Sequence, residues 1–201
     1  GKRVMNLGMS EHIAELESGE RIAWEKLVIA SGGVPIVPKM EGAGKRGIFT
    51  FTTLDDAKAI DEFLGDARNA VVIGGGLIGI SITEALKKRG VKVSVVEMKE
   101  RVLNTILDEQ ASQMVEGTLE QAGVKVITGH TVSEITGKEI VGGVVLDNGE
   151  EIPCSLVVVA IGVLPRTELA KGTEIKVNRG IVVDRHMATS YPDVYSCGDA
   201  A

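Results

Sequence analysis

From residue 70 to residue 130, apolar positions alternate between the spacing of β-strands and that of amphipathic helices. Short β-branched runs end at glycine or at polar residues, and longer stretches with an apolar face lie between them. The pattern predicts a strand-helix-strand-helix-strand order over Val71–Ile73, Leu77–Arg89, Val91–Glu97, Asp108–Gln121 and Val124–Ile127. Because strands that alternate with helices pair in parallel, we expect an α/β fold with helices on both faces of a parallel sheet.

After residue 130 the spacing changes to that of antiparallel strands. Three strand-like runs, Val132–Thr136, Glu139–Leu146 and Glu151–Ala160, are separated by short turns, and Asp147-Asn148-Gly149 is a strong hairpin signal. This order predicts an antiparallel β-meander crossover. The end of the last run, Leu156–Ala160, is apolar throughout, so we expect it to rejoin the parallel sheet as a strand buried on both faces.

Two segments of the chain resemble each other at a constant offset of 130 residues. Leu16–Pro35 and Leu146–Pro165 align without a gap, and both contain an acidic turn with glycine, a strand and the pattern Ala-x-Gly-x-x-Pro. If residues 70–165 form one nucleotide-binding unit, residues 4–35 are the second half of another, whose first half would precede Gly1. The alternative is a chance likeness between two hairpins that each lead into a buried strand.

A glycine motif, Gly74-x-Gly76-x-x-Gly79, lies between the first predicted strand and the first predicted helix. In this context it fits the dinucleotide-binding fingerprint of Rossmann-like folds: the first glycine permits the turn, the second lets the backbone approach a pyrophosphate, and the third lets helix and strand pack closely. The phosphates would lie against the free N–H groups of Leu77, Ile78 and Gly79, where the helix dipole favours negative charge.

Glu97 ends the second strand, 18 residues after Gly79. A carboxylate there accepts hydrogen bonds from both hydroxyls of an adenine ribose, and it would repel the 2′-phosphate of NADP. This favours NAD(H), although the cations Lys99 and Arg101 follow closely. The alternative is that Glu97 is simply an exposed strand end. FAD-binding domains use the same glycine fingerprint, so the motif alone is compatible with either NAD(H) or FAD.

Small residues also end the two repeated strands, at Ala30-Ser31-Gly32 and at Ala160-Ile161-Gly162. Such residues let a cofactor approach the carboxyl edge of a parallel sheet, and Gly162 is therefore a candidate contact. Near the C-terminal end, a short apolar segment runs into Gly198-Asp199. An ordinary turn is the alternative at all three places.

Composition and charge exclude several other classes of function. Lys and Arg total 22 against 28 Asp and Glu, the net charge is −6 and only 3% of residues are aromatic, which argues against nucleic-acid binding. The apolar runs are shorter than the ~20 residues that span a bilayer, so we expect a cytoplasmic protein. No disulfide, metal site or catalytic residue is predicted from the two cysteines, Cys154 and Cys197, or from the isolated histidines, His12, His130 and His186. We expect both cysteines to be core residues.

Taken in order, four segments of the chain resemble the pyridine nucleotide-disulfide oxidoreductase family, in particular its NADH oxidase and coenzyme A-disulfide reductase branch: Leu27–Gly32, Val71–Glu97, Val158–Pro165 and Thr189–Ala201. The resemblance implies an FAD/NAD(P)-binding fold, with 1–45 as the tail of an incomplete FAD-binding domain, 46–166 as the NAD(H)-binding domain and 167–201 as a return into the FAD-binding domain. It also implies that Asp199 binds the ribityl and phosphate region of FAD, and that the FAD fingerprint, the redox cysteine and the dimerisation domain are absent from this chain.

The resemblance further implies a flavoprotein that passes a hydride from NADH to FAD and then reduces a disulfide, oxygen or a redox protein. A homodimer is the assembly that we expect for it. Two positions depart from the family pattern: Ser81 stands where Glu is frequent, and Leu77 where many members of this branch have an aromatic residue. We expect this chain to bind NAD(H), to hold FAD weakly or not at all, and to be inactive alone. A non-catalytic NAD-sensing module and an S-adenosylmethionine-dependent methyltransferase-like domain are the alternatives.

Overall fold

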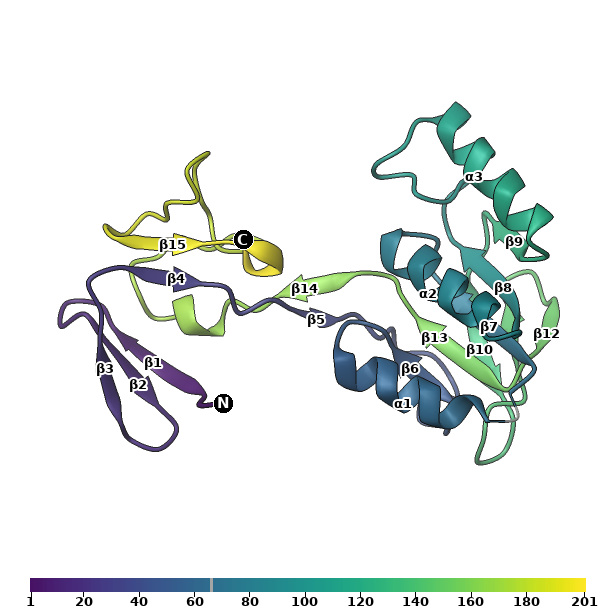
Figure 1. Ribbon diagram of the computed structural model, residues 1–201, viewed down its shortest axis with the longest axis horizontal. Coiled ribbons are helices and arrows are strands. Elements are labelled where there is room, and N and C mark those ends of the chain that lie inside the picture. Colours follow the sequence, from purple (N-terminus) through teal and green to yellow (C-terminus); the bar gives the residue numbers. More distant parts are fainter. Residues whose placement is uncertain (66) are drawn as a thin grey trace. The chain divides into compact units, whose positions relative to one another are not determined.

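The computed structural model describes residues 1–65 and 67–201, and these divide into two compact units (Figure 1). Unit 1 consists of the two ends of the chain, Gly1–Val34 and Val163–Ala201, and unit 2 is the continuous segment Pro35–Gly162. Unit 2 includes the segment before its first strand, because that segment packs against the rest of the unit. The N–H of Ile135 donates to the carbonyl of Glu41 at 2.9 Å, and Met40 lies against an apolar cluster of this unit.

Unit 2 is built on a five-stranded parallel sheet with the strand order β6-β13-β7-β8-β9. Its strands are β6 (Ile48–Thr50), β7 (Asn69–Ile73), β8 (Lys92–Glu97), β9 (Lys125–Thr128) and β13 (Leu156–Val159). β13 lies between β6 and β7, and its four residues are at most 3% exposed. The prediction that the last apolar run rejoins the main sheet as a buried strand is confirmed.

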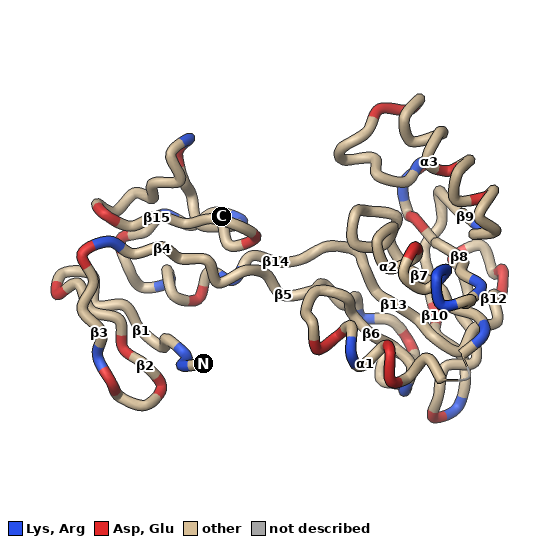
Figure 2. Tube along the Cα trace, viewed as in Figure 1, with Lys and Arg blue, Asp and Glu red and all other residues tan. Residues whose placement is uncertain are grey.

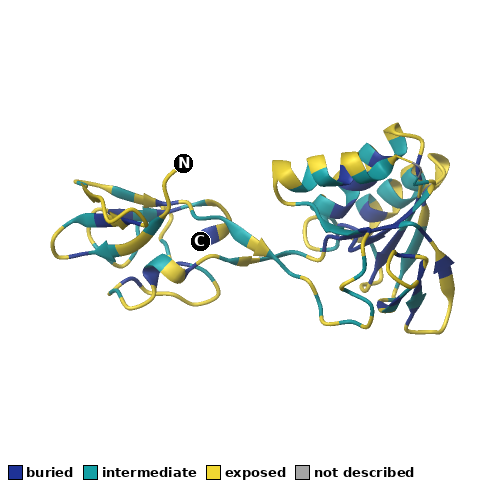
Figure 3. Ribbon diagram, turned by 90° about the horizontal axis from the view of Figure 1, so that it is seen from below, coloured by how far each residue is buried: buried dark blue, intermediate teal, exposed yellow. Residues whose placement is uncertain are grey.

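Three helices and an antiparallel meander cover opposite faces of this sheet. The helices are α1 (Leu54–Leu64), α2 (Leu77–Lys88) and α3 (Glu109–Gln121), and their apolar residues share one cluster with one set of alternating strand residues. The other set packs against the meander, whose strands are β10 (Val132–Thr136), β11 (Gly143–Leu146) and β12 (Glu151–Pro153). Figure 3 shows that buried residues concentrate in the strands of the parallel sheet.

The expected α/β class with a meander crossover is confirmed, but the expectation of helices on both faces is wrong for the described residues. Connections between parallel strands are right-handed. The helical connections all advance across the sheet in one direction, from β6 to β7, β8 and β9, so right-handedness puts all three helices on the same face. The meander returns from β9 to β13 in the opposite direction, which puts it on the other face.

Unit 1 contains three small sheets. Strands β1 (Val4–Gly8), β2 (Ile13–Leu16) and β3 (Arg21–Ala23) form an antiparallel sheet in that order. β4 (Leu27–Ile29) pairs in parallel with β15 (Val194–Ser196), and β5 (Gly33–Pro35) pairs with β14 (Val163–Pro165). Two 3₁₀ turns, η1 (Glu168–Ala170) and η2 (Gly198–Ala200), complete the unit. Its core is the cluster of Met9, Ile29, Ala170, Ile175, Ile181 and Val194.

The 130-residue repeat corresponds to a repeated structure. Strands β2, β3 and β5 recur at exactly that offset as β11, β12 and β14, and β4 recurs within β13. The likeness also extends to the preceding strands, β1 and β10. In the β1–β2 ladder the register shifts next to the pair Val4–Leu16, and in the β10–β11 ladder it shifts next to the equivalent pair Val132–Leu146. A chance likeness of sequence would not reproduce the strand positions and the irregularity together.

Charges of both signs are interspersed over each unit (Figure 2). Within residues 1–65 and 67–201, no helix is both long and apolar enough to cross a membrane.

Candidate functional site

The glycine motif forms the turn from β7 into α2, and its three glycines have different surroundings. Gly74 has a φ of +107°, and an added Cβ would overlap the carbonyl oxygen of Ala160. At Gly79 an added Cβ would overlap the carbonyl oxygen of Gly74, so the helix approaches the turn too closely for any side chain. At Gly76 an added Cβ would meet nothing within 4 Å, which leaves open space beside the backbone.

The N-terminus of α2 lies at this open space. Its N-cap is Gly76, and among the described residues no side chain caps the helix. The first N–H groups of a helix have no acceptor within it, so those of Leu77, Ile78 and Gly79 are available to a bound group. Leu77 is 62% exposed, whereas Ile78 packs partly against the core. The turn therefore presents backbone donors and the positive end of the helix dipole to an anion.

Glu97, at the end of β8, lies directly beside the glycine turn. Its Oε2 accepts a hydrogen bond from the N–H of Gly75 at 2.6 Å, and its Oε1 accepts one from the N–H of Lys99 at 2.8 Å. The residue is only 9% exposed, so the alternative of an exposed strand end is wrong. Since an ionised carboxylate has about four acceptor positions, Glu97 can still accept from a ligand while both backbone bonds remain.

Gly75 is a residue that the sequence analysis missed. Its N–H binds Glu97, its carbonyl accepts from the N–H of Leu103 at 2.8 Å, and an added Cβ would lie 2.9 Å from Cγ1 of Val102. The signal was that this glycine is the middle one of three in a row and occupies the variable position of the motif. Gly75 joins the turn to both Glu97 and the loop that follows β8.

The end of β13 completes the set of residues that unit 2 brings together. The carbonyl of Ala160 borders Gly74, and Gly162, two residues farther on, has a φ of +119° and accepts a hydrogen bond from the N–H of Ile36 at 2.9 Å. The carboxyl ends of β7, β8 and β13 thus meet around the glycine turn. This is the edge of an open parallel sheet where ligands bind.

Asp199 is not part of this arrangement, because it belongs to unit 1. It lies exposed in η2, directly after β15. The preceding Ser196 is fully buried, and its Oγ donates to the carbonyl of Ile29 at 2.9 Å, which fixes the end of β15 against β4. Gly198 has a φ of +70°, and an added Cβ would meet nothing within 4 Å, so the turn leaves space for a bound group.

The cysteines and histidines form no metal site. Within residues 1–65 and 67–201, no three His, Cys, Asp or Glu residues are arranged to hold a metal ion. Cys154 lies in the core under the meander, as predicted, and burial raises the pKa of its thiol to about 11. The expectation that His130 is isolated is wrong, because its Nδ1 lies 2.9 Å from Oδ1 of Asp147. The β10–β11 pairing brings these residues together, although they are 17 positions apart in the sequence.

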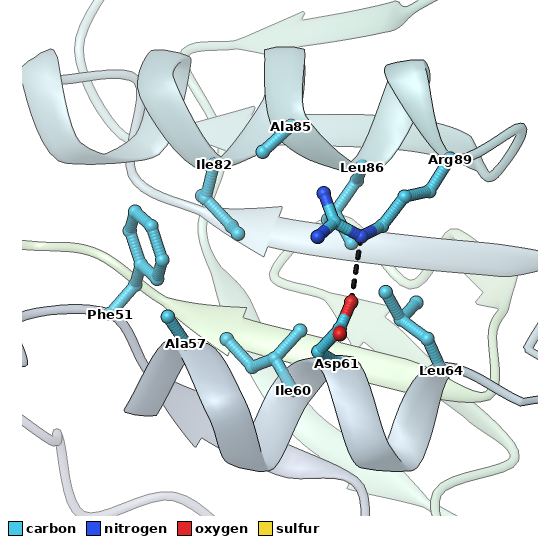
Figure 4. A pocket seen from close by; sticks show the side chains of 9 residues that line it. All are labelled: Phe51, Ala57, Ile60, Asp61, Leu64, Ile82, Ala85, Leu86 and Arg89. Atoms are coloured by element: carbon cyan, nitrogen blue, oxygen red, sulfur yellow. Dashed lines mark hydrogen bonds and ion pairs between the residues drawn. The ribbon is translucent and has the colours of Figure 1, made fainter. Parts of the chain in front are cut away.

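A small apolar pocket lies between α1 and α2, on the helix face of unit 2 (Figure 4). Ile60 and Leu64 line it from α1, Ile82 and Leu86 line it from α2, and the Nε of Arg89 donates to Oδ1 of Asp61 at 2.8 Å. The pocket follows the C-terminal half of α2, whereas the glycine turn precedes the N-terminus of that helix. It is therefore separate from the candidate site.

Comparison with known proteins identifies relatives along the whole chain. The model of the family described as pyridine nucleotide-disulphide oxidoreductase matches residues 2–201. The rubredoxin-NAD(+) reductase of Pseudomonas putida is 32% identical over 200 residues, which cover 99% of this chain and 52% of the relative. The NADH oxidase of Methanocaldococcus jannaschii is 36% identical over 179 residues, which cover 88% of this chain and 40% of the relative.

Solved structures show the same similarity in three dimensions. The crystal structure of a ferredoxin reductase from Rhodopseudomonas palustris superposes with a TM-score of 0.93 at 30% identity, covering 100% of this chain and 50% of that one. An NAD-dependent persulfide reductase from A. fulgidus gives a TM-score of 0.89 at 34% identity, covering 99% of this chain and 38% of that one. The curated relatives are longer: the chain spans 26% of one relative's length and 52% of another's.

Proposed function

The chain belongs to the pyridine nucleotide-disulphide oxidoreductase family, and from this premise we propose that unit 2 binds NADH at the glycine turn and presents it to FAD. The family consists of FAD-dependent oxidoreductases that use a nicotinamide nucleotide. The observation that carries the proposal is the position of Glu97, whose carboxylate is held at 2.6 Å from the N–H of Gly75, within the turn itself. A single ligand can therefore contact the turn and the carboxylate together.

The residues of the turn fit a dinucleotide. The open space at Gly76 admits the pyrophosphate, and the N–H groups of Leu77, Ile78 and Gly79 supply donors where the helix dipole favours negative charge. Glu97 accepts hydrogen bonds from the adenine ribose hydroxyls with its remaining lone pairs. The same carboxylate would repel the 2′-phosphate of NADPH, which supports a preference for NADH. At the end of β13, Gly162 is the further residue that we propose to contact the nucleotide.

FAD is the second cofactor of the proposed whole protein. When bound, NADH would supply the hydride and FAD would supply the group that can take it up for transfer to an acceptor. In unit 1 the space beside Gly198 and the exposed carboxylate of Asp199 fit contact with the flavin's ribityl and phosphate region. The relatives are named for different electron-transfer partners, rubredoxin in one and ferredoxin in another. We propose that the acceptor of the whole protein is a disulfide, oxygen or a redox protein.

To test the nucleotide site, the full chain is titrated with NADH and with NADPH, and binding is monitored through the nicotinamide fluorescence. We expect NADH to bind more tightly, and S-adenosylmethionine not to compete. Glu97→Gln should weaken NADH binding about tenfold, because the loss of a charged hydrogen-bond acceptor costs roughly 1.5 kcal/mol or more. It should also reduce the preference for NADH, since the amide no longer repels the 2′-phosphate.

The matched control is Glu100→Gln, which removes the same charge from an exposed position three residues farther on, in the loop that follows β8. It should leave the ratio of the two dissociation constants unchanged. Equal effects of the two substitutions would mean that only the net charge matters, and that Glu97 does not contact the ribose. Competition by S-adenosylmethionine would favour the methyltransferase-like alternative.

A second measurement concerns the flavin. We expect the purified chain to lack flavin absorbance and to give no NADH-dependent dye reduction, although it binds NADH. A yellow preparation that reduces the dye would show that these 201 residues suffice to hold FAD.

A further inference from the structure

We propose that helix α3 positions the glycine turn for nucleotide binding, through Ser112 and Glu116 acting on the loop that follows β8. This inference rests on the proposed NADH site and assigns to it two residues that do not belong to the fingerprint. Both act through the loop, so they are positioning residues.

The two side chains hold a single residue of the loop from both sides of its backbone. The hydroxyl of Ser112 donates to the carbonyl of Val102 at 2.8 Å, and Oε1 of Glu116 accepts from the N–H of Val102 at 3.0 Å. Ser112 and Glu116 lie one turn apart on α3 and therefore face the same side of the helix. Ser112 and Val102 are both fully buried, so the hydrogen bond between them is not readily replaced by water, whereas Glu116 is half-buried.

From Val102 the contacts continue directly into the glycine turn. Cγ1 of Val102 fills the space where a side chain at Gly75 would lie, and the N–H of the next residue, Leu103, donates to the carbonyl of Gly75 at 2.8 Å. Leu103 has a φ of +52°, in the left-handed region, although it is not glycine. A leucine keeps this conformation only where its surroundings hold it there. The two hydrogen bonds from α3 hold the residue immediately before it.

Gly75 is consequently bound on both sides of its own backbone. Its N–H donates to Glu97 and its carbonyl accepts from Leu103. Because Gly75 immediately precedes Gly76, a shift of the loop displaces the N–H groups of the turn and the Glu97 carboxylate together. Release of Val102 from α3 therefore weakens nucleotide binding without removing any group that contacts the nucleotide.

The test compares Ser112→Ala and Glu116→Ala in the full chain. Amide hydrogen exchange at Leu103 and Gly75 should accelerate in both variants, and the Kd for NADH should rise roughly fivefold to tenfold, the effect of losing one hydrogen bond. Glu116→Gln keeps an acceptor oxygen and should restore both values. The matched control is Thr118→Ala, which removes a hydroxyl from the same helix; this hydroxyl donates to the helical carbonyl of Met114 at 2.8 Å. It should change neither value.

The measurements are made well below the unfolding temperature of every variant, so that a purely structural role lowers the Tm and leaves the Kd unchanged. The proposal is overturned if both alanine variants keep the exchange rates and the Kd of the wild type. It is also overturned if Glu116→Gln and Glu116→Ala give the same values. If the wild-type chain does not bind NADH, the proposed function fails. In that case the exchange at Leu103 and Gly75 still decides whether α3 holds the turn.

Discussion

At Gly74 the backbone has a φ of +107°, and the carbonyl of Ala160 lies where a side chain would begin. Both features exclude other residues, one through backbone strain and the other through overlap with a neighbouring strand end. Gly117, in the middle of α3, has neither constraint, because an added Cβ would meet nothing within 4 Å. Glycine is thus required at position 74, whereas at position 117 it only lowers the stability of the helix.

The two glycines predict opposite results for the same substitution. Gly74→Ala should lower the free energy of unfolding by about 1–3 kcal/mol and abolish detectable NADH binding, because strain and overlap reshape the turn. Gly117→Ala should raise the free energy of unfolding by about 0.5–1 kcal/mol and leave NADH binding unchanged. Urea unfolding followed by circular dichroism, together with NADH titration, measures both. Equal stabilities of the two variants would contradict the geometry of the turn.

Among the elements, α1 and α2 begin in contrasting ways. α1 has a complete capping box, in which Thr53 Oγ1 accepts from the N–H of Asp56 at 3.1 Å and the carboxylate of Asp56 accepts from the N–H of Thr53 at 3.0 Å. α2 begins at Gly76 and, within the described chain, has no side-chain cap. The first N–H groups of α2 can therefore serve a ligand, whereas in α1 the capping side chains already accept from the N–H groups of Thr53 and Asp56.

The cap of α1 gives a prediction about pH. Burial raises the pKa of Asp56, but hydrogen bonds from Thr52 and Thr53 outweigh burial and lower this pKa from its ordinary value of 3.8. A carboxyl group with a lowered native pKa stabilises the fold fully above its ordinary value, and this contribution is lost as the pH falls through the native value. Asp56→Asn should therefore be less stable than wild type at neutral pH, and the difference should shrink below pH 3.8.

Two further variants check this account of the cap. Thr53→Ala should cost about 1 kcal/mol at neutral pH, the usual effect of losing an N-cap side chain. Asp55→Asn alters a first-turn carboxylate that is 95% exposed and should have almost no effect. Urea midpoints at several pH values give all the comparisons. A pH-independent difference between wild type and Asp56→Asn would show that the charge of Asp56 does not contribute to the cap.

At the scale of the whole molecule, each unit has its own core. The two large apolar clusters of unit 2, on the helix face and on the meander face, draw all their residues from the segment Pro35–Gly162. The core of unit 1 combines residues from both ends of the chain, and β4 and β15 pair although they are far apart in sequence. Unit 2 therefore contains what an independently folding domain requires.

We expect residues 35–162, produced alone, to unfold in one cooperative transition and to bind NADH with the same Kd as the full chain. The reason is that both cores, the glycine turn and Glu97 lie within this segment. Far-UV circular dichroism during thermal unfolding and NADH titration of both proteins measure this. A segment that stays unfolded, or that does not bind NADH when the full chain does, would show that unit 1 is needed for the site.

The amino-acid sequence by itself determined the local structure of this protein. Periodicity indicated α2, α3 and the strands of the meander, because an amphipathic helix and a half-buried strand each impose a short repeat on neighbouring residues. The glycine motif and Glu97 were also visible, because they depend on a turn and a strand end that are close in sequence. The 130-residue repeat was visible because both copies must satisfy the same turns and the same buried strand.

The tertiary structure decided what depends on contacts between distant residues. The order of the strands and the handedness of their connections placed all three helices on one face. Strand pairing joined His130 to Asp147, and the packing of α3 on the loop after β8 joined Ser112 and Glu116 to Val102. Such pairings follow from the register and packing of whole elements, and no short-range pattern of residues encodes them.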